Sequence, residues 1–168
     1  MKDIQNKVAN SVLEIFDLED YFPTAKHLEI DLTQWLFEGY VLKEKEFREQ
    51  LKNHDWNTYL DCNVTIYVPN GIIIPAWATL LITSQVAPFA KNTVVGNKND
   101  LLTYLYQKTL SELDYSIYDN KPVILKGCSK KPVPESAYIL AMQYLQKVAK
   151  SILYGEACSA VPLFKKAQ

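Results

Sequence analysis

Val64-Thr65-Ile66-Tyr67-Val68 is the first of four β-branched or apolar runs that decide the fold class of this chain. The other three lie at residues 93–95, 123–126 and 151–154. The runs recur about every 30 residues, which is the length of a β-α unit, whereas antiparallel hairpins repeat much faster. The pattern therefore predicts an α/β protein with a mainly parallel open sheet and helices on both of its faces.

Helical segments are expected between these runs, at residues 75–90, 99–113 and 134–150. Pro75 and Pro134 suit the first turn of a helix, where a missing N–H group costs nothing. Asn97 or Asn99, followed by Asp100, supplies a cap and a favourable negative charge for the second helix. Each predicted helix therefore has its own start signal.

The first 62 residues follow a different pattern. Residues 12–18 and 27–32 read as strands, and residues 43–53 read as a charged helix. We expect this portion to add antiparallel strands to the sheet or to pack over it. With 168 residues, of which 48% are hydrophobic and 22% charged, the chain is expected to form a single domain over residues 1–168, with an N-terminal portion at 1–62 and repeated β-α units at 63–168.

Glycine marks the end of each predicted central strand, at Gly71, Gly96, Gly127 and Gly155. The last two glycines precede cysteines in the sequences Gly127-Cys128-Ser129 and Gly155-Glu156-Ala157-Cys158. The carboxyl ends of parallel strands share one sheet edge, which is where open α/β proteins bind ligands. The sequence thus places two thiols at a candidate binding edge.

Cys128 is the stronger candidate for chemistry. A cysteine between a strand and a helix faces the positive end of the helix dipole, which favours the thiolate. Lys126, Lys130 and Lys131 would lower its pKa further if they converge on it. Cys128 could therefore be a nucleophile assisted by Lys130 and Lys131, a metal ligand or a redox-sensitive group. The alternative is a small buried side chain in a tight turn.

A metal site would combine Cys128 and Cys158 with further ligands, for which His54 and Glu156 are the candidates. Zinc or iron would suit such a set. The signature is weak, because the chain lacks a C-x-x-C pair. His54 also suits a plain position at a helix C-terminus. Cys62 precedes a strand, at the opposite edge, and is expected to pack.

Composition excludes several classes of function. The net charge of −1 leaves no electrostatic footprint for nucleic acid. The longest apolar run is shorter than the roughly 20 residues that cross a bilayer, so no membrane association is expected. The start of the chain lacks a signal-peptide pattern, and the three cysteines are an odd number. A cytoplasmic protein with reduced thiols is expected, and a homo-oligomer is compatible with the sequence.

Three motifs carry a resemblance that covers essentially the whole chain. They are Phe47-Arg48-Glu49 with Asn53-His54-Asp55-Trp56, then Lys126-Gly127-Cys128-Ser129 with residues 132–138, then residues 151–163. Together they resemble an uncharacterised Bacteroidetes family of domain-of-unknown-function proteins, DUF2480. The resemblance emphasises His54, Cys128, Glu135, Glu156 and Cys158. It implies no established activity, but it implies gene proximity to iron-sulfur cluster assembly components.

Taken together, these features suggest an accessory cytoplasmic protein whose Cys128 and Cys158, with His54 or Glu156, bind a metal or handle sulfur. The resemblance implies iron-sulfur metabolism as the process and iron-sulfur assembly proteins as the partners. One alternative is an enzyme with Cys128 as nucleophile, acting on a small anionic substrate. Another is a non-catalytic protein-interaction domain whose cysteines only pack.

Overall fold

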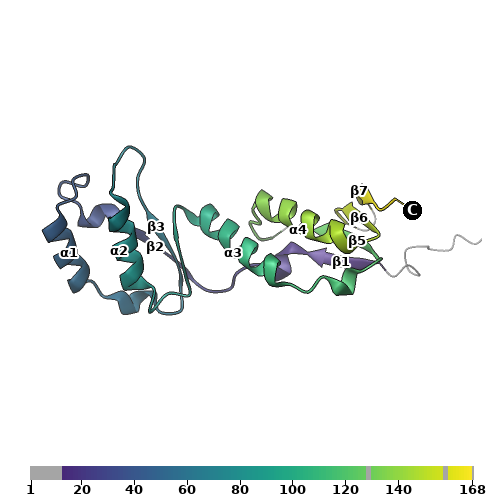
Figure 1. Ribbon diagram of the computed structural model, residues 1–168, viewed down its shortest axis with the longest axis horizontal. Helices are drawn as coiled ribbons and strands as arrows, with labels where there is room; N and C mark the ends of the chain where they lie inside the picture. The colour runs from purple at the N-terminus through teal and green to yellow at the C-terminus, as the bar shows by residue number, and fades with distance from the viewer. Residues whose placement is uncertain (1–12, 128–129, 157–158, 168) are drawn as a thin grey trace, which may run out of the picture. The chain divides into compact units, whose positions relative to one another are not determined.

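The computed structural model describes residues 13–127, 130–156 and 159–167. The chain is an α/β protein with mostly parallel sheets, divided into two compact units (Figure 1). One unit, here called the discontinuous unit, combines Met1–Phe22 with Leu105–Gln168; the other, the inserted unit, is Pro23–Tyr104. In the part of the chain that the structure describes, no helix is long and apolar enough to span a bilayer.

The inserted unit contains a three-stranded parallel sheet in the order β2-β3-β4. Its strands are β2 (His27–Asp31), β3 (Asn63–Tyr67) and β4 (Asn92–Val95). The connections contain α1 (Glu44–Asn53), α2 (Ala76–Val86) and the short 3₁₀ helices η2 (Leu32–Trp35) and η3 (Trp56–Tyr59). Each crossover is long enough to return the chain to the same sheet edge, and this makes the neighbouring strands parallel.

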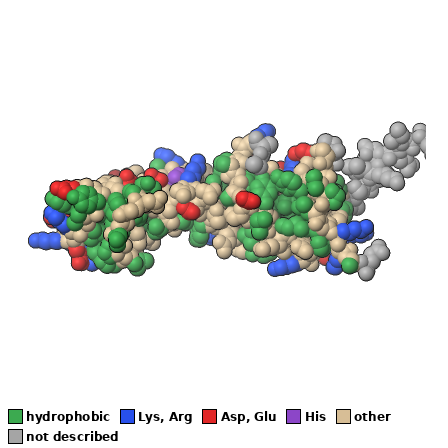
Figure 2. Space-filling view, turned by 90° about the horizontal axis from the view of Figure 1, so that it is seen from above, with side chains coloured by type: hydrophobic (Ala, Val, Ile, Leu, Met, Phe, Trp, Pro, Cys, Tyr) green, Lys and Arg blue, Asp and Glu red, His purple; other side chains and the backbone are tan. Residues whose placement is uncertain are grey.

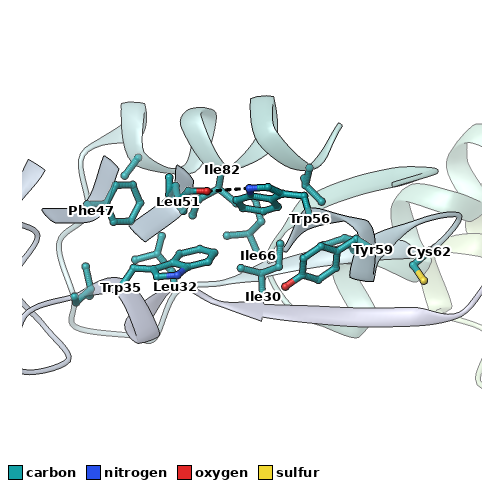
Figure 3. Packing of buried hydrophobic residues seen from close by; sticks show 14 residues of the cluster. Ile30, Leu32, Trp35, Phe47, Leu51, Trp56, Tyr59, Cys62, Ile66 and Ile82 are labelled. Carbon is teal, nitrogen blue, oxygen red and sulfur yellow. Dashed lines mark hydrogen bonds between the residues drawn. The ribbon is translucent and has the colours of Figure 1, made fainter. Parts of the chain in front are cut away.

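Aromatic side chains fill the core of the inserted unit (Figure 3). Phe47 of α1 is fully buried and lies edge-on to Trp35, with ring centroids 6.1 Å apart. The indole N–H of Trp56 donates a hydrogen bond of 3.0 Å to the Leu51 carbonyl at the end of α1. Ile66 of β3 and Ile82 of α2 belong to the same cluster. Burial of these side chains holds α1 and α2 on the sheet.

The discontinuous unit contains a four-stranded sheet in the order β1-β5-β6-β7. Its strands are β1 (Glu14–Asp17), β5 (Pro122–Lys126), β6 (Ser151–Tyr154) and β7 (Val161–Lys165). The first three run parallel, and β7 is antiparallel to β6. Its helices are η1 (Leu18–Tyr21), η4 (Ser116–Tyr118), α4 (Glu135–Val148) and the part of α3 (Lys98–Glu112) that follows Tyr104.

The sequence prediction of the fold class is confirmed, and two of its details are wrong. There are two sheets where one was expected. The N-terminal strands β1 and β2 pair in parallel with β5 and β3, so the expected antiparallel addition is absent from the described N-terminal portion. The reason is that α1 forms a crossover between β2 and β3. The antiparallel strand is β7, which follows β6 after a short return of the chain.

Candidate functional site

The candidate site is the carboxyl edge of β1, β5 and β6 in the discontinuous unit. β5 and β6 are hydrogen-bonded neighbours that run parallel, with Leu125 opposite Tyr154. The Gly155 N–H donates to the Leu125 carbonyl at 3.1 Å, so the pairing continues past the last residue of β6. Gly127 and Gly155 therefore leave the sheet at the same edge.

Gly127 is required here by both backbone conformation and space. Its φ is +155°, and a Cβ atom at this position would lie 3.0 Å from Tyr138 Oη and 3.1 Å from Leu18 Cβ. Gly155 has a φ of +110°, but the nearest atoms to its Cβ position are 3.9 Å away. The tight approach at Gly127 lets the end of β5 pass directly beneath Tyr138 of α4.

Three charged side chains meet at this edge, one from each parallel strand or its end. Lys126 Nζ lies 3.2 Å from Asp17 Oδ2, at the end of β1, and 3.9 Å from Glu156 Oε1, just after β6. Hydrogen bonding to Asp17, together with the negative charges of Asp17 and Glu156, raises the pKa of the Lys126 ammonium. Because Glu156 is 70% exposed and exposed ion pairs add little stability, its contact with Lys126 positions the carboxylate more than it stabilises the fold.

Asp17 belongs to this edge but was not predicted from the sequence. Its other carboxylate oxygen accepts a 2.9 Å hydrogen bond from the Glu19 N–H and so starts η1. A signal was present, because Asp17 is a charged residue near the end of the predicted strand at residues 12–18, as Lys126 is at the end of residues 123–126. The sequence does not reveal that β1 pairs with β5, and this pairing is what brings Asp17 to Lys126.

Lys130 and Lys131 tie the segment after β5 to η1. The backbone N–H of Lys130 donates to Glu19 Oε1, and the Lys131 ammonium donates to the Glu19 carbonyl, each at 2.9 Å. Lys131 also lies 5.7 Å from the centre of the Phe22 ring. The Lys131 ammonium thus binds a neutral carbonyl, whereas the Lys126 ammonium is paired with the carboxylates of Asp17 and Glu156.

The two thiols themselves, Cys128 and Cys158, lie outside the described residues, as do Ser129 and Ala157. Their proximity remains a prediction from the sequence. Within residues 13–127, 130–156 and 159–167, no group of three or more His, Cys, Asp or Glu side chains could hold a metal ion.

His54 lies in the inserted unit, whereas Glu156 lies in the discontinuous unit. The imidazole follows α1 and packs between aromatic rings, with centroids 5.2 Å from Trp35, 4.7 Å from Trp56 and 5.7 Å from Tyr59. Its Nε2 is 3.1 Å from Tyr59 Oη. These contacts favour the structural alternative, a histidine at a helix C-terminus, over a metal ligand.

The pH dependence of the free energy of unfolding tests whether His54 is packed among these aromatic rings. Burial lowers the pKa of His54 below its ordinary 6.5, and Asp55 offsets only part of the effect. Because the unfolded chain then binds the proton more tightly than the folded chain, the free energy of unfolding should fall as the pH drops below 6.5. We expect His54→Asn to reduce this slope in urea titrations between pH 7 and about pH 5.

His27 provides the matched comparison for that measurement. Burial and Lys98 lower its pKa in the same direction, so His27→Asn should also reduce the slope, and the double variant should reduce it most. A His54→Asn protein that keeps the full slope of the parent would contradict the assignment.

Cys62 is buried in the inserted unit, as its packing interpretation requires. Its Sγ lies 3.4 Å from the Leu60 carbonyl, one residue before β3 begins. Cys62 therefore serves as an internal reference thiol for experiments on the other two cysteines.

Comparison with known proteins identifies the family but no activity. Neither the curated proteins nor the solved structures contain a match to this chain. The model of the family DUF2480, described as a protein of unknown function, matches residues 2–166. The match spans both units and includes the whole carboxyl edge of β1, β5 and β6. The chain therefore belongs to the DUF2480 family of proteins of unknown function.

Proposed function

We propose that this chain is an accessory metal-binding protein whose Cys128 and Cys158 hold the ion at the carboxyl edge of β5 and β6. The observation that carries the proposal is the parallel pairing of these two strands, which brings Gly127 and Gly155 to one edge. Cys128 follows Gly127 directly, and Cys158 comes three residues after Gly155. Two thiols that follow neighbouring parallel strands so closely are suited to bind one metal ion together.

The charges around this edge support thiolate formation. Lys131 carries a positive charge close to Cys128 in the sequence, and positive charges near a thiol lower its pKa. Glu156 offers a third ligand, because its side chain is 70% exposed and its contact with Lys126 spans 3.9 Å. Two thiolates and a carboxylate suit Zn²⁺ or Fe²⁺ and leave one position of a tetrahedral site open.

An open coordination position suits a protein that delivers a metal better than one that uses it for folding. A partner could occupy that position with its own ligand during transfer. We therefore propose a role in metal supply, with iron-sulfur metabolism as the process that the family resemblance suggests. Glu156 would then be the ligand that yields, because its alternative partner, Lys126, lies beside it.

Metal titration of the reduced protein tests this proposal. Zn²⁺, Fe²⁺ or spectroscopically visible Co²⁺ is added without oxygen, and bound metal is measured after gel filtration. We expect one ion per chain, and a loss of affinity of at least about tenfold in Cys128→Ser and in Cys158→Ser. Cys62→Ser is the matched control, because it removes a buried thiol in the other unit and should bind metal as the parent does.

Two results would overturn the proposal. The first is a chain that binds no ion when both thiols are reduced. The second is binding that survives Cys158→Ser while Cys128 alone alkylates faster than a free thiol of pKa about 8.5. That second pattern is the one expected of a cysteine-nucleophile enzyme.

A further inference from the structure

A cavity of about 450 Å³ lies in the discontinuous unit, between α4 and the ends of the strands. Leu125 of β5, Tyr154 of β6 and Leu163 of β7 form one side of it, and α4 forms the other. This volume is within the range of small-molecule sites, roughly 300–1,000 Å³. It adjoins the carboxyl ends of β5 and β6, the edge at which parallel sheets bind ligands.

The walls of this cavity are mostly apolar and remain in contact with water. Ile139 is 57% exposed, Leu163 is 49% exposed and Tyr154 is 41% exposed. Figure 2 shows hydrophobic side chains gathered over α4 on this unit. A ligand that covers such surface gains about 25 cal/mol for each Å² of apolar area removed from water. Met142, also in the wall, can adapt its flexible thioether to the shape of the ligand.

The polar part of the lining selects the charge of the ligand. Among the described residues that line the cavity, Glu135 alone carries a charge. The rings of Tyr138 and Tyr154 meet edge to face, with centroids 6.0 Å apart. A carboxylate attracts a cation, and the electron-rich faces of aromatic rings do the same. This combination disfavours an anionic ligand and favours a positively charged group attached to an apolar body.

We propose that this cavity binds a small organic cation, namely an amine whose body is an aromatic ring or a branched alkyl group. The apolar part lies against Ile139, Met142 and Leu163, and the ammonium group faces Glu135. Tyr138, which pairs with Tyr154, packs closely against the end of β5, because Gly127 has no side chain to keep the two apart. The site needs neither Cys128 nor Cys158, and so it is independent of the proposed metal function.

Three probes that share one ring test this inference: phenethylamine as the cation, 2-phenylethanol as the neutral compound and 3-phenylpropionate as the anion. Each is titrated into the ¹⁵N-labelled full-length protein and followed by NMR. We expect phenethylamine to shift resonances of α4 and β6 and to bind about tenfold more tightly than 2-phenylethanol. The anion should bind more weakly than either.

Two exposed positions give variants that should keep the fold. Glu135→Gln is expected to abolish the preference for the cation while leaving 2-phenylethanol unchanged. Ile139→Ala should weaken all three probes. Glu112→Gln, at the exposed end of α3 in the same unit, is the control and should change none of them.

The inference is overturned if none of the probes binds, or if 3-phenylpropionate binds as tightly as phenethylamine. It is also overturned if the preference for the cation survives in Glu135→Gln. Folding of every variant is checked by comparing the resonances of β1, which contributes no residue to the cavity.

Discussion

Replacement of Phe47 by alanine is expected to lower the free energy of unfolding of the inserted unit by about 3–5 kcal/mol. The ring is fully buried and makes edge contacts with Trp35 at 6.1 Å and Trp77 at 5.9 Å. Its removal leaves a cavity that the rigid indoles cannot fill, in addition to the lost burial of apolar area. The substitution would also weaken the packing of α1 against Trp35 of η2 and Trp77 of α2.

Tryptophan fluorescence measures this loss selectively. The chain has three tryptophans, Trp35, Trp56 and Trp77, and all of them lie in the inserted unit. Urea titration followed at their emission therefore reports the unfolding of that unit. Ile73→Ala is the control, since Ile73 is 94% exposed and its truncation should change the free energy by no more than about 0.5 kcal/mol. A Phe47→Ala protein within 1 kcal/mol of the parent would contradict the packing described.

Replacement of Gly127 by alanine is expected to destabilise the discontinuous unit by about 1–3 kcal/mol. The residue would keep an unfavourable φ of +155°, and its Cβ would press on Tyr138 Oη at 3.0 Å and Leu18 Cβ at 3.1 Å. Hydrogen exchange of the β5 and α4 amides measures the loss, because these two elements would have to separate to relieve the contact.

Gly155→Ala is the matched comparison for this second prediction. It also carries a positive φ, of +110°, but its Cβ would meet nothing closer than 3.9 Å. Only backbone strain then remains, so its effect should be smaller than that of Gly127→Ala. Equal losses in the two variants would show that the crowding at Tyr138 and Leu18 adds nothing.

The helices and most strands were predictable because their signals are local. Apolar runs about 30 residues apart located β3, β4, β5 and β6, and prolines located the starts of α2 and α4. β7 was missed, because Pro162 lies inside it and proline argues against a strand. The strand tolerates this residue because it lies at the edge of the sheet, with a single neighbour.

Strand pairing was not predictable, because it depends on contacts between distant parts of the chain. The periodicity that locates a strand does not say which neighbour it will have, so one sheet was expected where there are two. The same limit applies to the site. Lys126 and Glu156 could be assigned to a sheet edge, but the ion pair between Lys126 and Asp17 depends on β1 lying beside β5. Because the sequence does not show the division into two units either, it could not show that His54 and Glu156 lie in different units.

The division of the chain sets an order for its synthesis on the ribosome. The inserted unit is continuous from Pro23 to Tyr104, so all of its strands are made before β5, β6 and β7. β1 is made before the inserted unit but pairs only with β5, as the ion pair between Glu14 and Lys121, 107 positions apart, illustrates. Contacts this distant in sequence form slowly. The nascent chain therefore carries an unpaired β1 until β5 has been made, and an unpaired strand edge of this kind is prone to aggregation before the sheet is complete.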